Sequence, residues 1–225
     1  RTPLAAIKGH ASTLLQEDVI WPVADQRHSL QTISGEADRL AQLVSNLLDL
    51  SRQETGLFLL NRALARVQDL VAQTSAHLSF PGVTLTVAIP DDLSPVNVDA
   101  TRIGVVLRNL IANAATYGGN AVRITASQGD DAIIIAVADN GAGIPPDELP
   151  HIFERFYRTR RGRQQHSGGT GLGLTICKAF VEAHGGTIWA ESDAQGTTIA
   201  FALPLGVPAI AAAPASNSGA DEQVA

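Results

Sequence analysis

Residues 169–176, Gly-Thr-Gly-Leu-Gly-Leu-Thr-Ile, combine residue types that are suited to binding phosphate. Three alternating glycines, Gly169, Gly171 and Gly173, come immediately before an apolar run that is suited to a helix. A backbone without Cβ atoms can fold closely around a polyphosphate, and the free N–H groups at the start of a helix attract negative charge. A tight turn that only caps a helix has the same pattern, so this run needs support from other segments.

Two asparagines, Asn109 and Asn113, stand four residues apart in a segment with helical periodicity. Side chains at this spacing lie on one face of a helix. Their amide oxygens are neutral, hard ligands of the kind that Mg²⁺ takes together with water and substrate phosphates. A capping or surface pair of asparagines is the alternative interpretation.

Asp139 follows the apolar run Ala132–Ala138 and precedes a Gly141-Ala-Gly143 turn. A strand that ends in this way places a carboxylate at the floor of a pocket, with backbone packed beside it. Because a carboxylate accepts hydrogen bonds and donates none, Asp139 can select a donor such as the exocyclic amine of adenine. An ordinary Asp-Asn-Gly turn has the same residues and is the alternative.

A basic, polar segment, residues 158–163, contains four arginines and leads toward the glycine run. It predicts a mobile lid that contacts phosphates, and a solvated surface loop is the alternative. Phe153 and Phe156, which precede it, are expected to anchor this loop in the core. Further along, Gly196-Thr197 stands before the last apolar strand.

The elements that hold these residues begin with two predicted helices, over 3–17 and 25–51, separated by Trp21-Pro22 because proline disfavours a helix interior. The second helix has an apolar stripe that repeats every three or four residues, formed by Leu30, Ile33, Ala37, Leu40, Val44 and Leu47. Two amphipathic helices cannot bury both stripes alone. We therefore expect a hairpin that dimerises into a four-helix bundle, with an intramolecular bundle or packing on the next domain as alternatives.

After Gly56 the pattern changes to short strands mixed with helices. Strands are predicted over 83–89, 122–126, 132–138, 187–191 and 197–203, and helices over 67–77, 101–117 and 172–184. The predicted fold class is α+β, with a helical hairpin over 1–55 and a two-layer α/β sandwich over 62–205. Residues 206–225, rich in Ala, Pro, Ser and Gly, are expected to be disordered because they bury too little apolar area.

The composition excludes several classes of protein. The chain of 225 residues has a net charge of −6 and no long Lys/Arg run, which argues against a nucleic-acid partner. Its apolar runs are shorter than the roughly 20 residues that span a bilayer. Cys177, the single cysteine, fits a reducing compartment and is expected to be a buried side chain, with a reactive thiol as the alternative. A start at Arg-Thr-Pro without Met indicates a piece of a longer protein.

Taken in order, these segments resemble the ATP-binding boxes of sensor histidine kinases, whose catalytic domain has the GHKL (Bergerat) fold shared with gyrase, heat-shock-ninety and mismatch-repair ATPases. The N box corresponds to Asn109–Asn113, the first G box to Asp139–Gly143, the F box to Phe153–Arg158, and the second and third G boxes to Gly169–Gly173 and Gly196-Thr197. Arg1-Thr2-Pro3-Leu4 resembles the end of the phosphoacceptor motif His-Glu-Leu-Arg-Thr-Pro. Leu47–Arg52 with Gly56 resembles the end of the second dimerisation helix. The resemblance extends to Pro204, and the hairpin is similar to that of KdpD-like sensors.

This resemblance implies roles in binding ATP and Mg²⁺. Asn113 would coordinate Mg²⁺, Asn109 would support the ion or the phosphates, and Asp139 would receive the adenine amine. Gly141 and Gly143 would leave room for the base. The other nucleotide-binding residues that it implies are Tyr117, Arg158, Gly169, Thr170, Gly171, Leu172, Gly173 and Thr197, of which Arg158 would contact the terminal phosphate.

The resemblance also implies an activity. Mg²⁺-ATP would phosphorylate a histidine of the dimeric hairpin, and the phosphoryl group would pass to an aspartate of a response regulator receiver domain. Thr2 matches the residue that helps position water when such kinases dephosphorylate the regulator, with an N-cap before Pro3 as the alternative. The domain would be cytoplasmic, in a parent attached to the inner membrane through upstream segments.

Two departures from the family pattern bear on activity. Thr116 stands where the family commonly has Lys, and the phosphoacceptor would lie three residues before Arg1, so this chain is expected to bind ATP without autophosphorylating. The six histidines are expected to lie on the surface or at the bundle rim; they are His10, His28, His77, His151, His166 and His184. Two alternatives are a related kinase acting on Ser of an anti-sigma antagonist, which would lack the Arg-Thr-Pro hairpin, and a nucleotide-binding dimer scaffold with degenerate chemistry.

Overall fold

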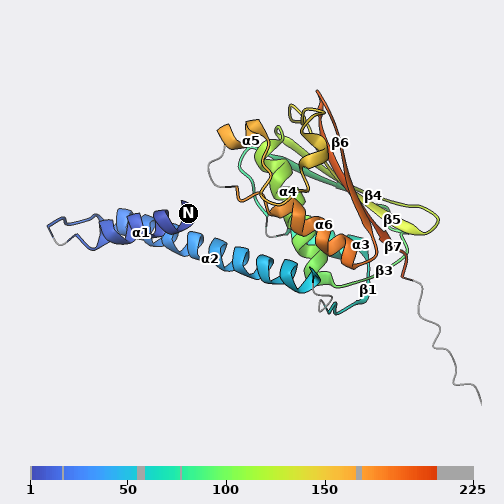
Figure 1. Ribbon diagram of the computed structural model, residues 1–225, viewed down its shortest axis with the longest axis horizontal. Helices are drawn as coiled ribbons and strands as arrows, with labels where there is room; N and C mark the ends of the chain where they lie inside the picture. The colour runs from blue at the N-terminus through green and yellow to red at the C-terminus, as the bar shows by residue number, and fades with distance from the viewer. Residues whose placement is uncertain (1, 17, 55–58, 77, 166–168, 207–225) are drawn as a thin grey trace, which may run out of the picture.

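A computed structural model describes residues 2–16, 18–54, 59–76, 78–165 and 169–206. It shows a long helical hairpin beside an α/β sandwich (Figure 1). This arrangement confirms the predicted α+β fold class. Gly56, the predicted end of the hairpin, and residues 207–225 of the predicted disordered tail lie outside the described residues.

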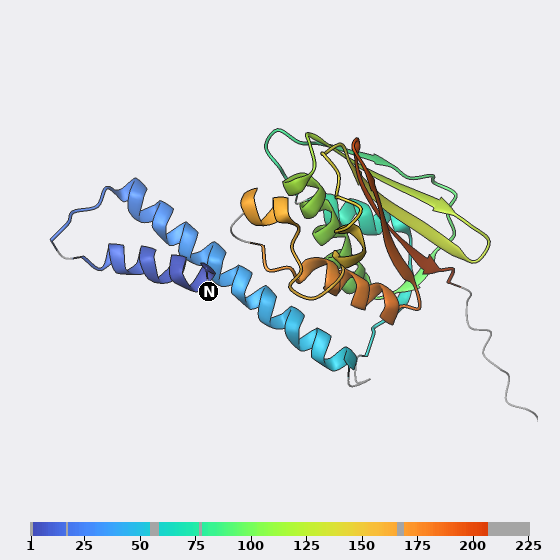
Figure 2. The ribbon, with the colours of Figure 1, turned by 45° about the horizontal axis from the view of Figure 1, so that its top comes forward.

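The hairpin consists of α1 (Thr2–Leu14) and α2 (Val23–Glu54). The turn between them includes Trp21-Pro22, as predicted. Helix α1 lies along the first half of α2, and the later half of α2 passes beside α6 of the sandwich (Figure 2). On the apolar stripe of α2, Leu30 and Val44 stay 58% and 56% exposed, so the hairpin leaves part of this stripe uncovered.

The sandwich is built on a five-stranded sheet in the order β2-β4-β5-β7-β6. Strand β2 pairs in parallel with β4, and the other neighbours are antiparallel. The strands are β2 (Thr84–Ala88), β4 (Ala121–Gln128), β5 (Ala132–Asp139), β6 (Thr187–Asp193) and β7 (Gly196–Pro204). All five match the strands predicted from the sequence to within one or two residues at each end.

Three helices pack on one face of this sheet: α3 (Val67–Ser75), α4 (Ala100–Tyr117) and α6 (Gly173–Ala183). Because side chains alternate along a strand, every second residue of β4, β5 and β7 meets these helices. Ile124, Ile135 and Phe201 of the sheet are fully buried in the shared core. This layer brings the end of β5 close to the last turns of α4, where the candidate site lies.

Four short elements have no counterpart in the sequence prediction. Strands β1 (Ala63–Ala65) and β3 (Val96–Val98) form an antiparallel pair, and η1 (Leu149–His151) and α5 (Arg160–Gln165) lie between β5 and α6. Segments of three to six residues show too little periodicity to be recognised from sequence. Within the described part of the chain, no helix is both long and apolar enough to span a membrane.

Candidate functional site

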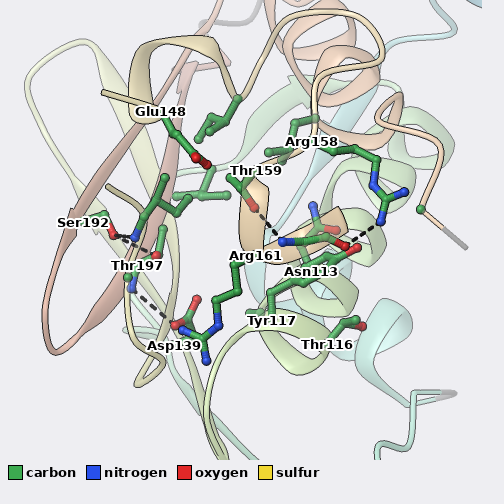
Figure 3. Close-up of a pocket in the computed structure, with 18 of the residues that line it drawn as sticks. Asn113, Thr116, Tyr117, Asp139, Glu148, Arg158, Thr159, Arg161, Ser192 and Thr197 are labelled. Carbon is green, nitrogen blue, oxygen red and sulfur yellow. Dashed lines mark hydrogen bonds between the residues drawn. The ribbon is translucent and has the colours of Figure 1, made fainter. Parts of the chain in front are cut away.

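A cavity of about 1220 Å³ opens beside the last turns of α4 (Figure 3). Most of the predicted nucleotide-binding residues line it: Asn109, Asn113, Tyr117, Asp139, Gly143, Arg158, Gly169, Thr170, Gly171, Gly173 and Thr197. Gly141 and Leu172 are not among the residues that line it. Thr2 is the first residue of α1, in the hairpin, and its side chain is outside the described structure.

The two carboxylate oxygens of Asp139, at the end of β5, differ in their hydrogen bonds. Its Oδ1 accepts the backbone N–H groups of Gly141 at 2.8 Å and Thr197 at 3.3 Å. Oδ2 has no hydrogen-bond partner among the described residues. The side chain is therefore held in orientation while one acceptor remains available at the cavity wall.

Ser192 joins the two loops that flank Asp139. Its hydroxyl accepts the N–H of Ile144 at 2.7 Å and donates to the carbonyl of Gly196 at 3.0 Å. Because this donation uses the only hydroxyl proton of Ser192, the Thr197 hydroxyl, 2.9 Å away, is the donor between the two side chains. Ser192 was not predicted from the sequence, because a single serine in a strand carries no motif.

The glycines of the first G box allow neighbouring backbone segments to pack closely against them. A Cβ on Gly143, whose φ is +69°, would lie 1.8 Å from the Asp193 carbonyl oxygen. A Cβ on Gly141 would lie 2.8 Å from the Cα of Gly118. The Cβ positions of these two glycines are thus occupied by neighbouring backbone, so a larger side chain would not fit at either position. Gly118 was also missed, although the Gly118-Gly119 pair after Tyr117 was a visible signal.

The second glycine run forms the other end of the cavity. A Cβ on Gly169 would lie 3.0 Å from the Tyr117 hydroxyl and 3.4 Å from Arg158 Nε, so these three residues meet. Helix α6 begins at Gly173, and no described side chain caps its N-terminus. Its first N–H groups carry partial positive charge, which favours an anion at this position.

The N-box side chains extend along α4 toward this end of the cavity. Asn109 and Asn113 are both half-buried on its wall. The Asn109 Nδ2 atom is buried and has no hydrogen-bond partner among the described residues. Neutral amides, uncapped N–H groups and Arg158 together fit a metal-bound polyphosphate. Thr116, where the family commonly has Lys, is an exposed residue of the cavity lining.

The arginine segment is anchored by a buried carboxylate. Glu148, 3% exposed, accepts the Arg160 backbone N–H at 3.2 Å and pairs with Arg160 Nε at 3.2 Å. Arg158 donates to the Gly162 carbonyl at 2.5 Å, and several residues of α5 line the cavity. The side chain of Arg161 points into the cavity on the side of Asp139 (Figure 3). Glu148 was not predicted, because an acidic residue in a Pro-rich turn is expected to be exposed on the surface.

The two F-box phenylalanines differ. Phe153 is half-buried and packs against the core, as predicted. The prediction that Phe156 is a core anchor is wrong, since it is 65% exposed. Its φ is +63°, and its N–H donates to the Gly171 carbonyl at 3.0 Å. This turn against the glycine run directs the ring away from the core.

The predicted burial of Cys177 and the predicted surface or rim positions of three histidines are confirmed. Cys177 is fully buried, and burial raises the pKa of its thiol to about 12. His28 and His151 are exposed and His10 is half-buried against α2, whereas His77 and His166 lie outside the described residues. The prediction of a surface position for His184 is wrong, because this residue is only 2% exposed. Burial at the end of α6 lowers the pKa of its imidazole.

A five-stranded sheet covered by three helices, with a cavity at the end of β5 that Asp139, Asn109 and Asn113 help to line, defines an ATPase-type α/β sandwich preceded by a helical hairpin. Residues 98–207 match the family "Histidine kinase-, DNA gyrase B-, and HSP90-like ATPase", and residues 1–56 match the "His Kinase A (phospho-acceptor) domain". The chain belongs to the sensor histidine kinases of two-component systems. Its two domains are those of protein-histidine kinases, which are transferases.

Named relatives agree with this family. The sensor histidine kinase WalK of Bacillus subtilis is 34% identical over 91% of this chain, and the sensor protein KdpD of Clostridium acetobutylicum is 32% identical over 88%. The chain spans 34% and 23% of their respective lengths.

Solved structures show the same architecture. Full-length ShkA in complex with AMPPNP is 27% identical, with a TM-score of 0.68 over 91% of this chain and 43% of that chain. The histidine kinase AdeS of Acinetobacter baumannii shares the fold at 22% identity, with a TM-score of 0.73 over 92% of this chain and 97% of that chain.

Proposed function

We propose that this chain is the catalytic core of its sensor kinase. ATP binds in the cavity with Mg²⁺, its terminal phosphoryl group passes to a histidine of the hairpin, and a response regulator aspartate then receives it. Residues 1–55 would form the dimerising hairpin and residues 62–205 the ATP-binding domain. A cytoplasmic domain of a membrane-attached parent fits this role.

The observation that carries the proposal is the distribution of unused polar groups in one cavity. Asp139 Oδ2, an acceptor without a partner, lies at one end, and the uncapped start of α6 lies at the other. Adenine offers an amine donor, and a triphosphate offers negative charge. A nucleoside triphosphate therefore satisfies both ends, and the complex of the relative ShkA with AMPPNP supports this assignment.

Individual residues then take the following roles. Asp139 orients the base, Thr197 and Ser192 hold Asp139 in place, and Tyr117 lies beside the nucleotide. Bound Mg²⁺ would neutralise charge on the phosphates, with Asn113 as its protein ligand and Asn109 supporting it. Gly169 to Gly173, including Thr170 and Leu172, give backbone N–H groups to the phosphates. Since phosphoryl transfer depends on positioning and charge neutralisation, these groups together with Arg158 are chemically sufficient.

Response-regulator dephosphorylation is a further part of the proposal. Thr2 would position the attacking water near the regulator aspartate. The family resemblance of Arg1-Thr2-Pro3 supports this role.

The test is Mg²⁺-dependent ATP binding by the Asp139→Asn variant. Asparagine keeps an oxygen for the Gly141 and Thr197 N–H groups but presents an NH₂ to the adenine amine, so two donors face each other. We expect affinity to fall at least tenfold in isothermal titration calorimetry, equivalent to about 1.4 kcal/mol. Asp131→Asn, in the exposed β4–β5 turn, is the matched control. Equal binding by wild type and Asp139→Asn would overturn the assignment.

A nucleotide-binding scaffold without kinase activity is the second candidate, favoured by Thr116 at the exposed rim of the cavity. A chain extended upstream by its natural sequence distinguishes the two. We expect this chain to form an acid-labile, base-stable phosphohistidine with radiolabelled ATP. Nucleotide binding without phosphohistidine would favour the scaffold.

A further inference from the structure

His184 is a buried, titratable side chain that the proposed chemistry leaves unused. It lies at the C-terminal end of α6, and both ring nitrogens form hydrogen bonds. Nδ1 lies 2.7 Å from the Phe180 carbonyl, and Nε2 lies 2.9 Å from the backbone nitrogen of Asp99. A carbonyl only accepts and a backbone N–H only donates, so the imidazole is neutral with its proton on Nδ1.

The partner, Asp99, connects two other parts of the chain. Its Oδ1 accepts the Arg102 N–H at 3.1 Å and so caps the start of α4. Its Oδ2 accepts the backbone N–H of Asn61 at 3.1 Å, in the segment that leads from the hairpin into the sandwich. Asp99 is 8% exposed, so its carboxylate is largely removed from water.

The same connecting segment also reaches α6. Arg62 donates from Nη2 to the Ala183 carbonyl at 2.7 Å, next to His184. Residues 63–65 then pair as β1 with β3, which ends immediately before Asp99. The segment after the hairpin is thus bonded to the start of α4 and to the end of α6 at one place.

This junction lies at the opposite ends of α4 and α6 from the cavity. Asp99 is about 21 Å along the helix from Asn113, at 1.5 Å per residue. Helix α6 presents Gly173 to the cavity and His184 to the junction. The two helices that flank the cavity are therefore held at their far ends by the segment arriving from the hairpin.

We propose that His184 is a positioning residue that, through Asp99, fastens the hairpin-to-sandwich segment to the helix carrying Asn109 and Asn113. The junction formed by Asn61, Arg62, Asp99 and His184 sets where the ATP cavity stands relative to the hairpin. This inference rests on the proposed function, because it concerns phosphoryl transfer from that cavity to the hairpin. It predicts a loss of transfer without a loss of nucleotide affinity.

Asp99→Asn isolates the bond to the connecting segment. Asparagine is as good an N-cap as aspartate and keeps the backbone N–H for His184. It has only one side-chain oxygen, so the Asn61 N–H loses its acceptor. His184→Leu removes both imidazole bonds, and His184→Gln, which carries both an amide oxygen and an NH₂, is the conservative variant.

Amide hydrogen exchange on the unliganded chain is the first measurement. We expect the Asn61 amide to exchange at least tenfold faster in Asp99→Asn and His184→Leu, and within threefold of wild type in His184→Gln. The Ile135 amide of β5 reports the core and should stay unchanged in Asp99→Asn. Unchanged exchange at Asn61, or an equal rise at Asn61 and Ile135 in Asp99→Asn, would overturn the proposal.

The second measurement compares binding with transfer in the chain extended upstream. We expect the Kd for Mg²⁺-ATP to stay within twofold in Asp99→Asn, while the rate of phosphohistidine formation falls at least fivefold. A parallel loss of affinity and rate would mean that Asp99 only supports the cavity. If wild type binds no nucleotide, the proposed function fails, yet the exchange experiment still tests the junction.

Discussion

At the scale of single residues, the hydrogen bonds distinguish polar side chains that stabilise the fold from those that leave an atom available to a ligand. Asp139 leaves Oδ2 without a partner among the described residues at the cavity, whereas Ser192 uses its whole hydroxyl within the protein. An adenine amine that donates to Asp139 Oδ2 would add a hydrogen bond that the described protein groups do not make, which favours binding.

Phe156 is predicted to lower the stability of the sandwich. A bulky residue at positive φ costs about 1–2 kcal/mol, and this ring is mostly exposed. Asparagine tolerates the left-handed conformation, so Phe156→Asn should raise the free energy of unfolding by about 0.5–1 kcal/mol. Urea denaturation measures this change. Phe156→Ala keeps the strain and serves as control, and equal destabilisation by both variants would show that the ring packs.

His184 makes stability depend on pH. Burial, reinforced by the Arg62 charge, holds its folded-state pKa below 6.5, although the Phe180 carbonyl and the Asp99 carboxylate oppose this shift. The unfolded chain therefore binds more protons between the folded pKa and 6.5. The free energy of unfolding should fall as pH decreases through that window and be insensitive to His184 above it.

Urea denaturation between pH 8 and pH 5 tests this dependence. His184→Gln has no titrating group at this position, so its stability should fall less steeply over the same range. Parallel curves for wild type and His184→Gln would contradict the prediction.

At the scale of elements, α4 and α6 form the two sides of the site, and the loops between strands close it. Helix α4 contributes both asparagines and Tyr117, while α6 contributes an N-terminus. Glycine is required where these pieces meet, because a Cβ on Gly143 or Gly196 would lie within 2 Å of a carbonyl oxygen. Close backbone contacts at these glycines therefore fix the positions of the loops that form the site.

The position of helix α5 depends on Glu148. Removing its charge with Glu148→Gln weakens the bonds to Arg160, and we expect trypsin to cleave after the arginines of 160–163 at least fivefold faster. Asp147→Asn is the matched control, because the Asp147–Arg160 pair at 2.7 Å is 60–70% exposed and such pairs contribute little. Initial cleavage rates by mass spectrometry measure the difference. Equal acceleration in both variants would contradict the prediction.

At the scale of the whole molecule, the hairpin and the sandwich differ in how completely each buries its own apolar side chains. The sandwich buries its own core, whereas α2 leaves apolar side chains uncovered. A second hairpin would cover them and complete a four-helix bundle. In the proposed function, the junction at Asp99 and His184 would link a dimerising unit to an ATP-binding unit.

Leu30→Glu is predicted to weaken the proposed homodimer. A carboxylate on the apolar stripe would be desolvated in the bundle, so the dimer Kd should rise at least tenfold in sedimentation equilibrium. Val87→Glu is the control, since Val87 is 47% exposed on β2, away from the hairpin. A monomeric wild type, or an unchanged dimer of Leu30→Glu, would contradict dimerisation through this face.

The sequence by itself determined the longer elements and the order of the chemical motifs. The stripe of α2, the apolar run of β5 and the glycines before α6 are local patterns, because helix period, strand alternation and turn chemistry involve near neighbours. For the same reason Asp139 was recognisable as a carboxylate delivered by a strand into a turn.

Only the tertiary structure decided which residues meet across the chain. Asp99 bonds His184 over 85 positions, Arg160 is held by Glu148, and Gly118 packs on Gly141. It likewise placed His184 in the core and Phe156 at the surface, opposite to their predicted positions. Contacts between residues so far apart leave no periodic trace, because they depend on how the elements pack and not on their individual patterns.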